Sequence, residues 1–168
     1  MSIVTYAGHV KRAKAWYNQS NIFLGIGGQT AWTDETQPPV ETADETISDV
    51  ICLKHVEQKN YVVEDASGTI YYRNKYYRIV HEADIYAEKC RWVFVSCWLN
   101  YDEAPVGVSY RKIGCYTDVE RNSGVGASKY VLVPSEIKDY GVMEVVANTT
   151  STIRSKDKRE RLALILEF

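Results

Sequence analysis

Residues 92–99 read Trp-Val-Phe-Val-Ser-Cys-Trp-Leu, with large apolar side chains at both odd and even positions. Successive side chains of a strand point to opposite faces of its sheet, so a strand with one face in water alternates between apolar and polar residues. This run does not alternate. We therefore predict a central strand over Arg91–Leu99 that is covered on both faces.

Further runs rich in Val, Ile, Leu and Tyr predict more strands on either side. Before the central strand they lie at 50–53, 61–63, 69–72 and 76–80. Turn-forming residues at 58–60, 67–68 and 73–75 separate them, which predicts an antiparallel meander over 47–100. After it, strands are expected at 110–117, 130–133, 142–147 and 162–166, with a helical turn at 135–137. In the last strand Leu162, Leu164 and Leu166 share one face.

The N-terminal part predicts one helix over Ser2–Asn18, because Val10, Ala13 and Tyr17 recur at helical spacing. A short buried strand over Asn21–Gly28 and a long polar loop over Gln29–Thr46 should follow. The chain has 168 residues, a length that suits one hydrophobic core. The expected fold is mainly β: an antiparallel, β-sandwich-like single domain over residues 1–168 with one N-terminal helix.

Composition and charge point to protein partners. Apolar residues make up 45% and charged residues 25% of the chain, as in globular domains. The formal net charge of −2 offers no field for nucleic acid or an acidic membrane, so neither is expected as a partner. No apolar run is long enough to span a membrane, and no secretory signal is recognisable. The thirteen tyrosines and four tryptophans fit either a binding surface or ordinary strand positions.

Known binding motifs fit this sequence poorly. The stretch Gly25–Thr30 lacks the third glycine of a dinucleotide loop and the Gly-Lys-Ser/Thr of a P-loop. Cys52 and His55 would face opposite sides of a strand, which disfavours a shared zinc ion. The four cysteines form no C-x-x-C pair and sit in apolar stretches, so we interpret them as small buried thiols. We predict no metal and no cofactor.

No catalytic constellation is recognisable either. The three histidines do not stand beside a nucleophile motif such as G-x-S-x-G. A group of carboxylates falls in the polar loop and is expected to be solvated: Asp34, Glu35, Glu41, Asp44 and Glu45. We therefore predict that the protein is not an enzyme and has no catalytic residues.

A basic cluster lies near the C-terminus. It contains Arg154, Lys156, Lys158, Arg159 and Arg161. Because Asp157 and Glu160 are interleaved with these cations, a solvated loop or a salt-bridged protein contact is favoured over a phosphate site.

Three segments, in this order, carry a resemblance to a known family. The first is Asn21–Trp32 followed by Pro38-Pro39, the second is Tyr110–Gly114, and the third is Gly141–Glu144 continuing through Asn148 to the apolar ending Leu164–Phe168. Together they resemble a shorter version of the baseplate wedge protein of contractile-tailed bacteriophages, the T-even-like subunit that bridges neighbouring wedge proteins.

The resemblance implies a structural subunit of the virion, located in the tail baseplate and assembled in the host cytoplasm. It implies other baseplate wedge proteins as partners and a homodimer within the baseplate. Contacts are expected from the loop 29–46 and the closing segment 148–161. The candidate interface residues are Trp32, Pro38, Pro39, Asn148, Arg154 and Arg159.

Some alternatives stay open. Trp32 could anchor a partner or could cap the core of its own subunit. The chain could also be a small β-fold tail adaptor that binds a peptide or sugar through its tyrosines, or a hydrolase whose site is not recognised.

Overall fold

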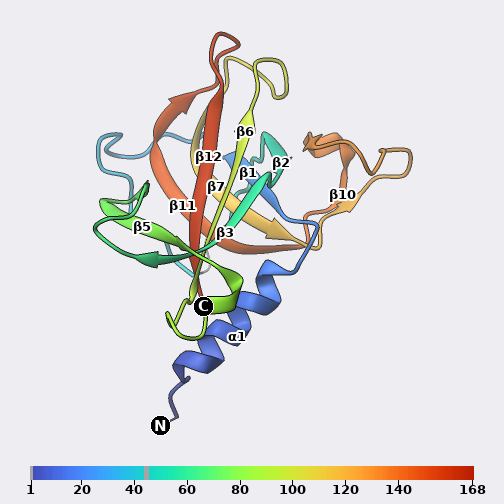
Figure 1. The fold of residues 1–168 in the computed structure, drawn as a ribbon. Helices are drawn as coiled ribbons and strands as arrows, with labels where there is room; N and C mark the ends of the chain where they lie inside the picture. The colour runs from blue at the N-terminus through green and yellow to red at the C-terminus, as the bar shows by residue number, and fades with distance from the viewer. Residues whose placement is uncertain (1, 44–45) are drawn as a thin grey trace. The chain divides into compact units, whose positions relative to one another are not determined.

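The computed structural model describes residues 2–43 and 46–168. It consists mainly of antiparallel strands with one helix near the N-terminus, which confirms the predicted fold class (Figure 1). The backbone packing divides the chain into two compact units. Unit 1 comprises Met1–Ser20, Glu57–Ser96 and Ala163–Phe168, and unit 2 comprises Asn21–Val56 and Cys97–Leu162.

Unit 1 contains the helix α1 (Tyr6–Tyr17), so the helix prediction is confirmed with a later start. The side chain of Thr5 accepts a hydrogen bond from the backbone N–H of Gly8 and caps the first turn. Val10, Ala13 and Trp16 form the buried face of the helix. At its end, the ammonium group of Lys59 donates to the carbonyl oxygen of Tyr17, in the last turn, and to that of Gln19, just beyond the helix.

The sheet of unit 1 has the strand order β12-β6-β3-β5-β4. Its strands are β3 (Gln58–Glu64), β4 (Ile70–Tyr72), β5 (Lys75–Val80), β6 (Trp92–Leu99) and β12 (Glu160–Glu167). The central position predicted for residues 91–99 is confirmed, because β6 lies between β12 and β3 and is buried from Val93 to Cys97. Leu162, Leu164 and Leu166 are buried along β12, as expected. Residues 97–99 and 160–162 of these strands are grouped with unit 2.

The predicted meander is wrong in two places. Residues 58–60 belong to β3 and not to a turn, because pairing of Gln58 with Ser96 extends the ladder with β6. The strand at 50–53 leaves this sheet and becomes β2 (Cys52–His55), which pairs with β1 (Phe23–Gly27) in unit 2. The turn at 73–74 is confirmed, with positive φ at both Arg73 and Asn74 as a tight two-residue hairpin requires.

Unit 2 contains a five-stranded sheet in the order β11-β7-β1-β2-β9 and a two-stranded sheet of β8 and β10 (Figure 1). The remaining bounds are β7 (Ser109–Thr117), β8 (Glu120–Arg121), β9 (Val131–Leu132), β10 (Ile137–Asp139) and β11 (Val142–Ile153). Strand β11 is therefore longer than the predicted 142–147, and β10 was not predicted. Short 3-10 helices occur at Glu82–Asp84 in unit 1 and at Pro134–Glu136 in unit 2, the second close to the expected helical turn.

Gly25 has a packing role in the core of unit 2. A Cβ atom at this position would lie 2.5 Å from Leu53 Cδ2 and 2.8 Å from Tyr116 Cε2. Both of these side chains belong to the buried cluster that also contains Phe23 and Leu132. The glycine therefore lets the cluster close over β1, which is a different use from cradling a phosphate.

Candidate protein-interaction site

A long loop between β1 and β2 is the most prominent irregular feature of unit 2. Its two ends are joined by the carboxylate of Asp49, which accepts hydrogen bonds from the backbone N–H groups of Gly28 at 3.0 Å and Gln29 at 2.6 Å. Gly28 has a φ of 75°, a conformation that glycine adopts without strain. The loop thus leaves and re-enters the sheet at one point, as in a closed surface loop.

Arg111 on β7 holds the first part of this loop. Its Nε donates to both carboxylate oxygens of Glu35 at 2.9 and 3.0 Å, and its Nη1 donates to the carbonyl oxygen of Gln29 at 2.8 Å. The hydrogen bonds from Arg111 lower the pKa of the Glu35 carboxyl below its usual value. The expectation of a solvated carboxylate is therefore wrong for Glu35. Asp44 and Glu45 lie outside the described residues.

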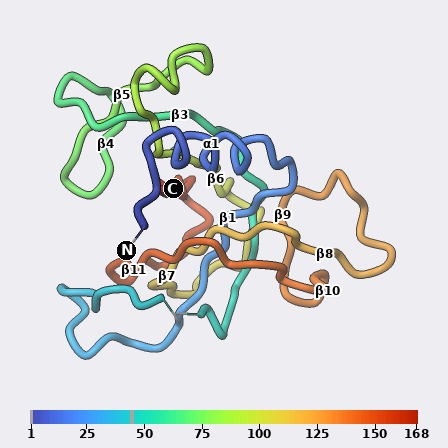
Figure 2. The backbone as a smooth tube through the Cα atoms, turned by 90° about the horizontal axis from the view of Figure 1, so that it is seen from below, coloured from blue at the N-terminus to red at the C-terminus, as the bar shows by residue number. Residues whose placement is uncertain are grey.

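The second part of the loop lies along the edge strand β11. The backbone N–H of Asn148 donates to Glu41 Oε1 at 2.8 Å, and the Asn148 side-chain amide donates to the carbonyl oxygen of Pro39 at 2.9 Å. Trp32 Nε1 donates to the carbonyl oxygen of Thr149 at 2.9 Å. Figure 2 shows this part of the chain beside β11. An edge strand exposes unpaired backbone groups, and here the loop satisfies two of them.

Three of the candidate interface residues therefore meet at one place. Trp32, Pro39 and Asn148 form the attachment between the loop and β11. Trp32 is half-buried, and the ammonium group of Lys112 lies 5.6 Å from its ring centroid. This geometry shows Trp32 in contact with its own chain. Pro38 is half-buried, whereas Pro39 and the following Val40, which is 86% accessible, are exposed.

Arg154 was expected to contact a partner, but its side chain has no exposed surface through which it could do so. Its guanidinium donates to the carbonyl oxygens of Ser155, Lys158, Asn100 and Tyr101. These carbonyls belong to two separate connections, one after β6 and one after β11. Arg154 therefore joins two loops of unit 2 from within and supports a surface that other residues present.

That surface carries Arg159, which is exposed as expected. Its guanidinium lies 4.8 Å from the ring centroid of Trp98, whose side chain is 38% exposed. We call the exposed group Trp98, Tyr101, Lys156, Lys158 and Arg159 the Trp98 surface. Sequence reasoning missed Trp98, because the apolar run 92–99 indicated burial throughout, and it did not single out Tyr101. The signal available was the tryptophan itself, a residue type enriched where proteins bind each other.

The cysteines, which the sequence offered as possible metal ligands, belong to the structural core. All four cysteines are buried and free, which confirms their interpretation as buried thiols. Burial raises the pKa of the Cys52 thiol to about 12, so this group is protonated at neutral pH. Within residues 2–43 and 46–168, no group of three or more His, Cys, Asp or Glu side chains could hold a metal ion. In the same ranges, no helix combines the length and the apolar character needed to cross a membrane.

The fold and these surfaces define a β-rich structural subunit. The family model described as "Baseplate wedge 3 tail fiber network component" matches residues 1–168, and the chain belongs to this family. It is also similar to "Virion protein 3" of Enterococcus phage phiEF24C, with 27% identity over 158 residues that cover 89% of this chain and 86% of that protein. The resemblance to phage baseplate wedge proteins is thereby confirmed, and the protein has a structural role in the phage baseplate.

Proposed function

We propose that this chain joins neighbouring wedge proteins in the baseplate of a contractile tail, by surface contact and without catalysis or a cofactor. It assembles in the host cytoplasm, as a homodimer within the baseplate, and binds neither nucleic acid nor a membrane. The observation that carries the proposal is the tethering of the loop after β1, in which Asp49, Arg111 and Asn148 bond to Gly28, Glu35 and Glu41. A loop that is already ordered loses little conformational entropy on binding.

Two surfaces of unit 2 are suited to such contacts. The loop presents Pro39 and Val40 on a backbone that Asn148 tethers. The Trp98 surface combines Trp, Tyr and Arg side chains, the residue types that dominate the binding energy of interfaces. Because Arg154 binds four carbonyl groups beneath it, this second surface is also ordered before a partner arrives.

Chemical cross-linking of intact phage particles, followed by mass spectrometry, tests the proposal. Lys156 and Lys158 lie on the Trp98 surface and should form cross-links to other baseplate proteins. The variant Arg159→Glu should fold normally and enter particles less efficiently. Arg12→Glu is a matched control, because Arg12 is also exposed but lies on α1. Absence of the chain from mature particles, or cross-links confined to copies of itself, would exclude a bridging role.

A further inference from the structure

The Trp98 surface is formed mainly by two connections of unit 2, residues 100–108 between β6 and β7 and residues 154–159 between β11 and β12. Figure 1 shows these two connections beside each other. The guanidinium of Arg154 donates to the carbonyl oxygens of Tyr101 and Lys158, one in each connection. The connections therefore form one continuous surface, which is ordered before a partner binds.

One carboxylate that the sequence places among the cations of this surface lies inside the protein. Glu160 is only 8% exposed. Its Oε2 accepts a hydrogen bond from the hydroxyl of Tyr110 at 3.1 Å, and its Oε1 lies 3.7 Å from Arg154 Nη1. The interleaved acidic residues of 154–161 suggested a nearly balanced charge, but the structure removes Glu160 from the surface. The exposed part of the segment is therefore more positive than its composition indicates.

The exposed cations of the two connections outnumber their exposed carboxylates. Glu103 is engaged within the chain, because it pairs with the buried Lys54 at 2.8 Å and accepts a hydrogen bond from the backbone N–H of Asn100. The exposed charged residues that remain are Lys156, Lys158, Arg159, Asp102 and Asp157. Three cations thus face two carboxylates, and all three cations lie on the connection 154–159.

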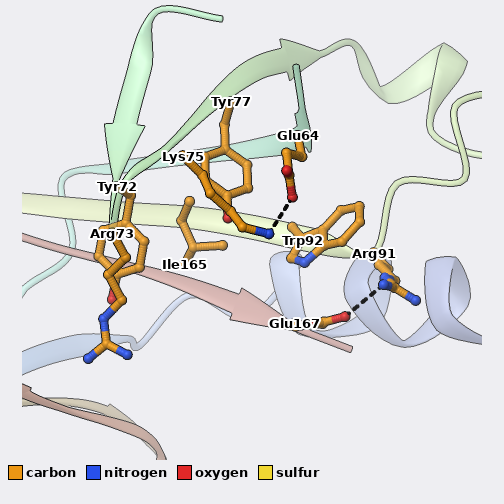
Figure 3. A pocket seen from close by; sticks show the side chains of 9 residues that line it. All are labelled: Glu64, Tyr72, Arg73, Lys75, Tyr77, Arg91, Trp92, Ile165 and Glu167. Atoms are coloured by element: carbon orange, nitrogen blue, oxygen red, sulfur yellow. Dashed lines mark hydrogen bonds and ion pairs between the residues drawn. The ribbon is translucent and has the colours of Figure 1, made fainter. Parts of the chain in front are cut away.

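The cations of the pocket in unit 1 differ in this respect. Figure 3 shows this pocket of about 420 Å³, in which Lys75 pairs with Glu64 at 2.7 Å and Arg91 pairs with Glu167 at 3.0 Å. Within residues 2–43 and 46–168, no ion pair of this kind engages the three exposed cations of the Trp98 surface. Their charge is therefore available to a partner.

We propose that the Trp98 surface binds an acidic segment of another baseplate protein. The proposal rests on the bridging function proposed above and names the chemistry of the partner at this site. Carboxylates of the partner pair with Lys156 and Lys158, and an apolar side chain between them covers the exposed parts of Trp98 and Tyr101. The charges guide association and select the partner, while the aromatic rings supply apolar contact area.

A second copy of the chain is a poorer match for this surface, because its own acidic loop is already engaged. The described carboxylates of the loop 29–46 all accept hydrogen bonds from groups of their own chain, namely those of Asp34, Glu35 and Glu41. A nucleic acid is also a poorer match. Asp157 stands between two of the cations and the whole chain has a net charge of −2, which disfavours a continuous row of phosphates.

Zero-length cross-linking of intact phage particles tests the proposal, because a carbodiimide joins a lysine amine to a carboxylate only where the two are in contact. Lys156 or Lys158 should be joined to Asp or Glu residues of another baseplate protein, and mass spectrometry identifies the linked residues. The variant Lys156→Arg/Lys158→Arg keeps both charges but removes the reactive amines. It should therefore lose these cross-links and still enter particles at the wild-type level.

Charge reversal supplies the second measurement. Lys156→Glu/Lys158→Glu should lower the amount of the chain in purified particles at least about tenfold, because like charges then face each other. Lys11→Glu/Arg12→Glu is the matched control, since it makes the same change of charge at exposed positions of α1. This control should enter particles normally, and circular dichroism should show all variants folded.

The outcomes separate this proposal from the bridging function. Amine-to-amine cross-links from Lys156 to a neighbouring protein, without carbodiimide links to its carboxylates, would overturn the acidic partner and leave the bridging function intact. Carbodiimide links found only between copies of the chain would also overturn it. So would tight binding of a single-stranded DNA oligonucleotide that Lys156→Glu/Lys158→Glu abolishes, or normal incorporation of that variant.

Discussion

Arg154 shows how a single side chain organises a surface that it does not belong to. Its guanidinium is fully buried, and Glu160 Oε1 lies 3.7 Å from its Nη1. The hydroxyl of Tyr110 donates to the other oxygen of Glu160 at 3.1 Å, so that the carboxylate has a partner on each side. A buried charge is stable only with such partners, and removing one of them leaves the others uncompensated.

Arg154→Leu should therefore destabilise the protein strongly, by about 3 to 5 kcal/mol, because four carbonyl groups lose their donor and the buried Glu160 carboxylate loses its ion-pair partner. Urea unfolding followed by circular dichroism measures the change. The exposed neighbour Arg159 provides the comparison. Arg159→Leu removes one cation–π contact with Trp98 and should cost less than about 1 kcal/mol. Equal effects of the two substitutions would show that Arg154 does not hold the loops together.

Trp32→Phe should loosen the long loop while the rest of the protein stays folded. The substitution keeps an aromatic ring but removes the hydrogen bond to Thr149. We expect a loss of about 0.5 to 1.5 kcal/mol in the attachment of the loop. A protease that cleaves after glutamate should then cut faster at Glu35 and Glu41. Trp98→Phe, which does not touch this loop bond, should leave the cleavage rate unchanged.

Trp32→Ala extends the same argument to assembly. Because the Trp32 ring attaches the loop to β11, this variant should fold but enter wedges poorly. Comparison of the amount of the chain in purified tails with that in the soluble fraction measures incorporation. Normal incorporation of Trp32→Ala would show that the loop is not required for assembly.

At the scale of elements, the loop 28–49 and the edge strand β11 stabilise each other. The loop satisfies backbone groups of Asn148 and Thr149, near a register shift in the pairing of β11 with β7. In return, the strand fixes Trp32 and Pro39. A bare edge strand is a template for unwanted pairing, so this coverage also limits aggregation.

The attachment of the loop should depend on pH. Arg111 lowers the pKa of Glu35, so the ion pair stabilises the attachment above the ordinary value of about 4.5 and loses this effect as the pH falls through the lowered pKa. The indole N–H resonance of Trp32 should therefore shift with a midpoint below 4.5. In Glu35→Gln this transition should be absent. A transition that persists in Glu35→Gln would assign it to another carboxyl group.

At the scale of the whole molecule, we expect one cooperative unfolding transition, in line with the predicted single domain. Strands β6 and β12 each contribute residues to both units, so neither unit can lose its part of a strand without affecting the other. Tryptophan fluorescence and far-ultraviolet circular dichroism should give coincident urea transitions, the test for two-state behaviour. Two separated transitions would identify two domains.

Local patterns in the sequence determined much of this molecule. Helical spacing of Val10 and Ala13 located α1, the unbroken apolar run 92–99 located the central strand β6, and the turn residues Arg73-Asn74 located a hairpin. Each of these signals is carried by residues close together in the chain, where the period and the φ preferences are set. The three segments that resemble wedge proteins, taken in their order along the chain, also indicated the family, because each is a pattern of neighbouring residues.

Only the tertiary structure decided which distant residues meet. Trp32 bonds to Thr149 across 117 residues of chain, and Arg111 bonds to Glu35 across 76. The departure of β2 from the meander and the burial of Arg154 likewise depend on what packs around them. Pairing and burial of this kind are set by the competition among all possible partners for the same surface, and no short stretch of sequence contains that information.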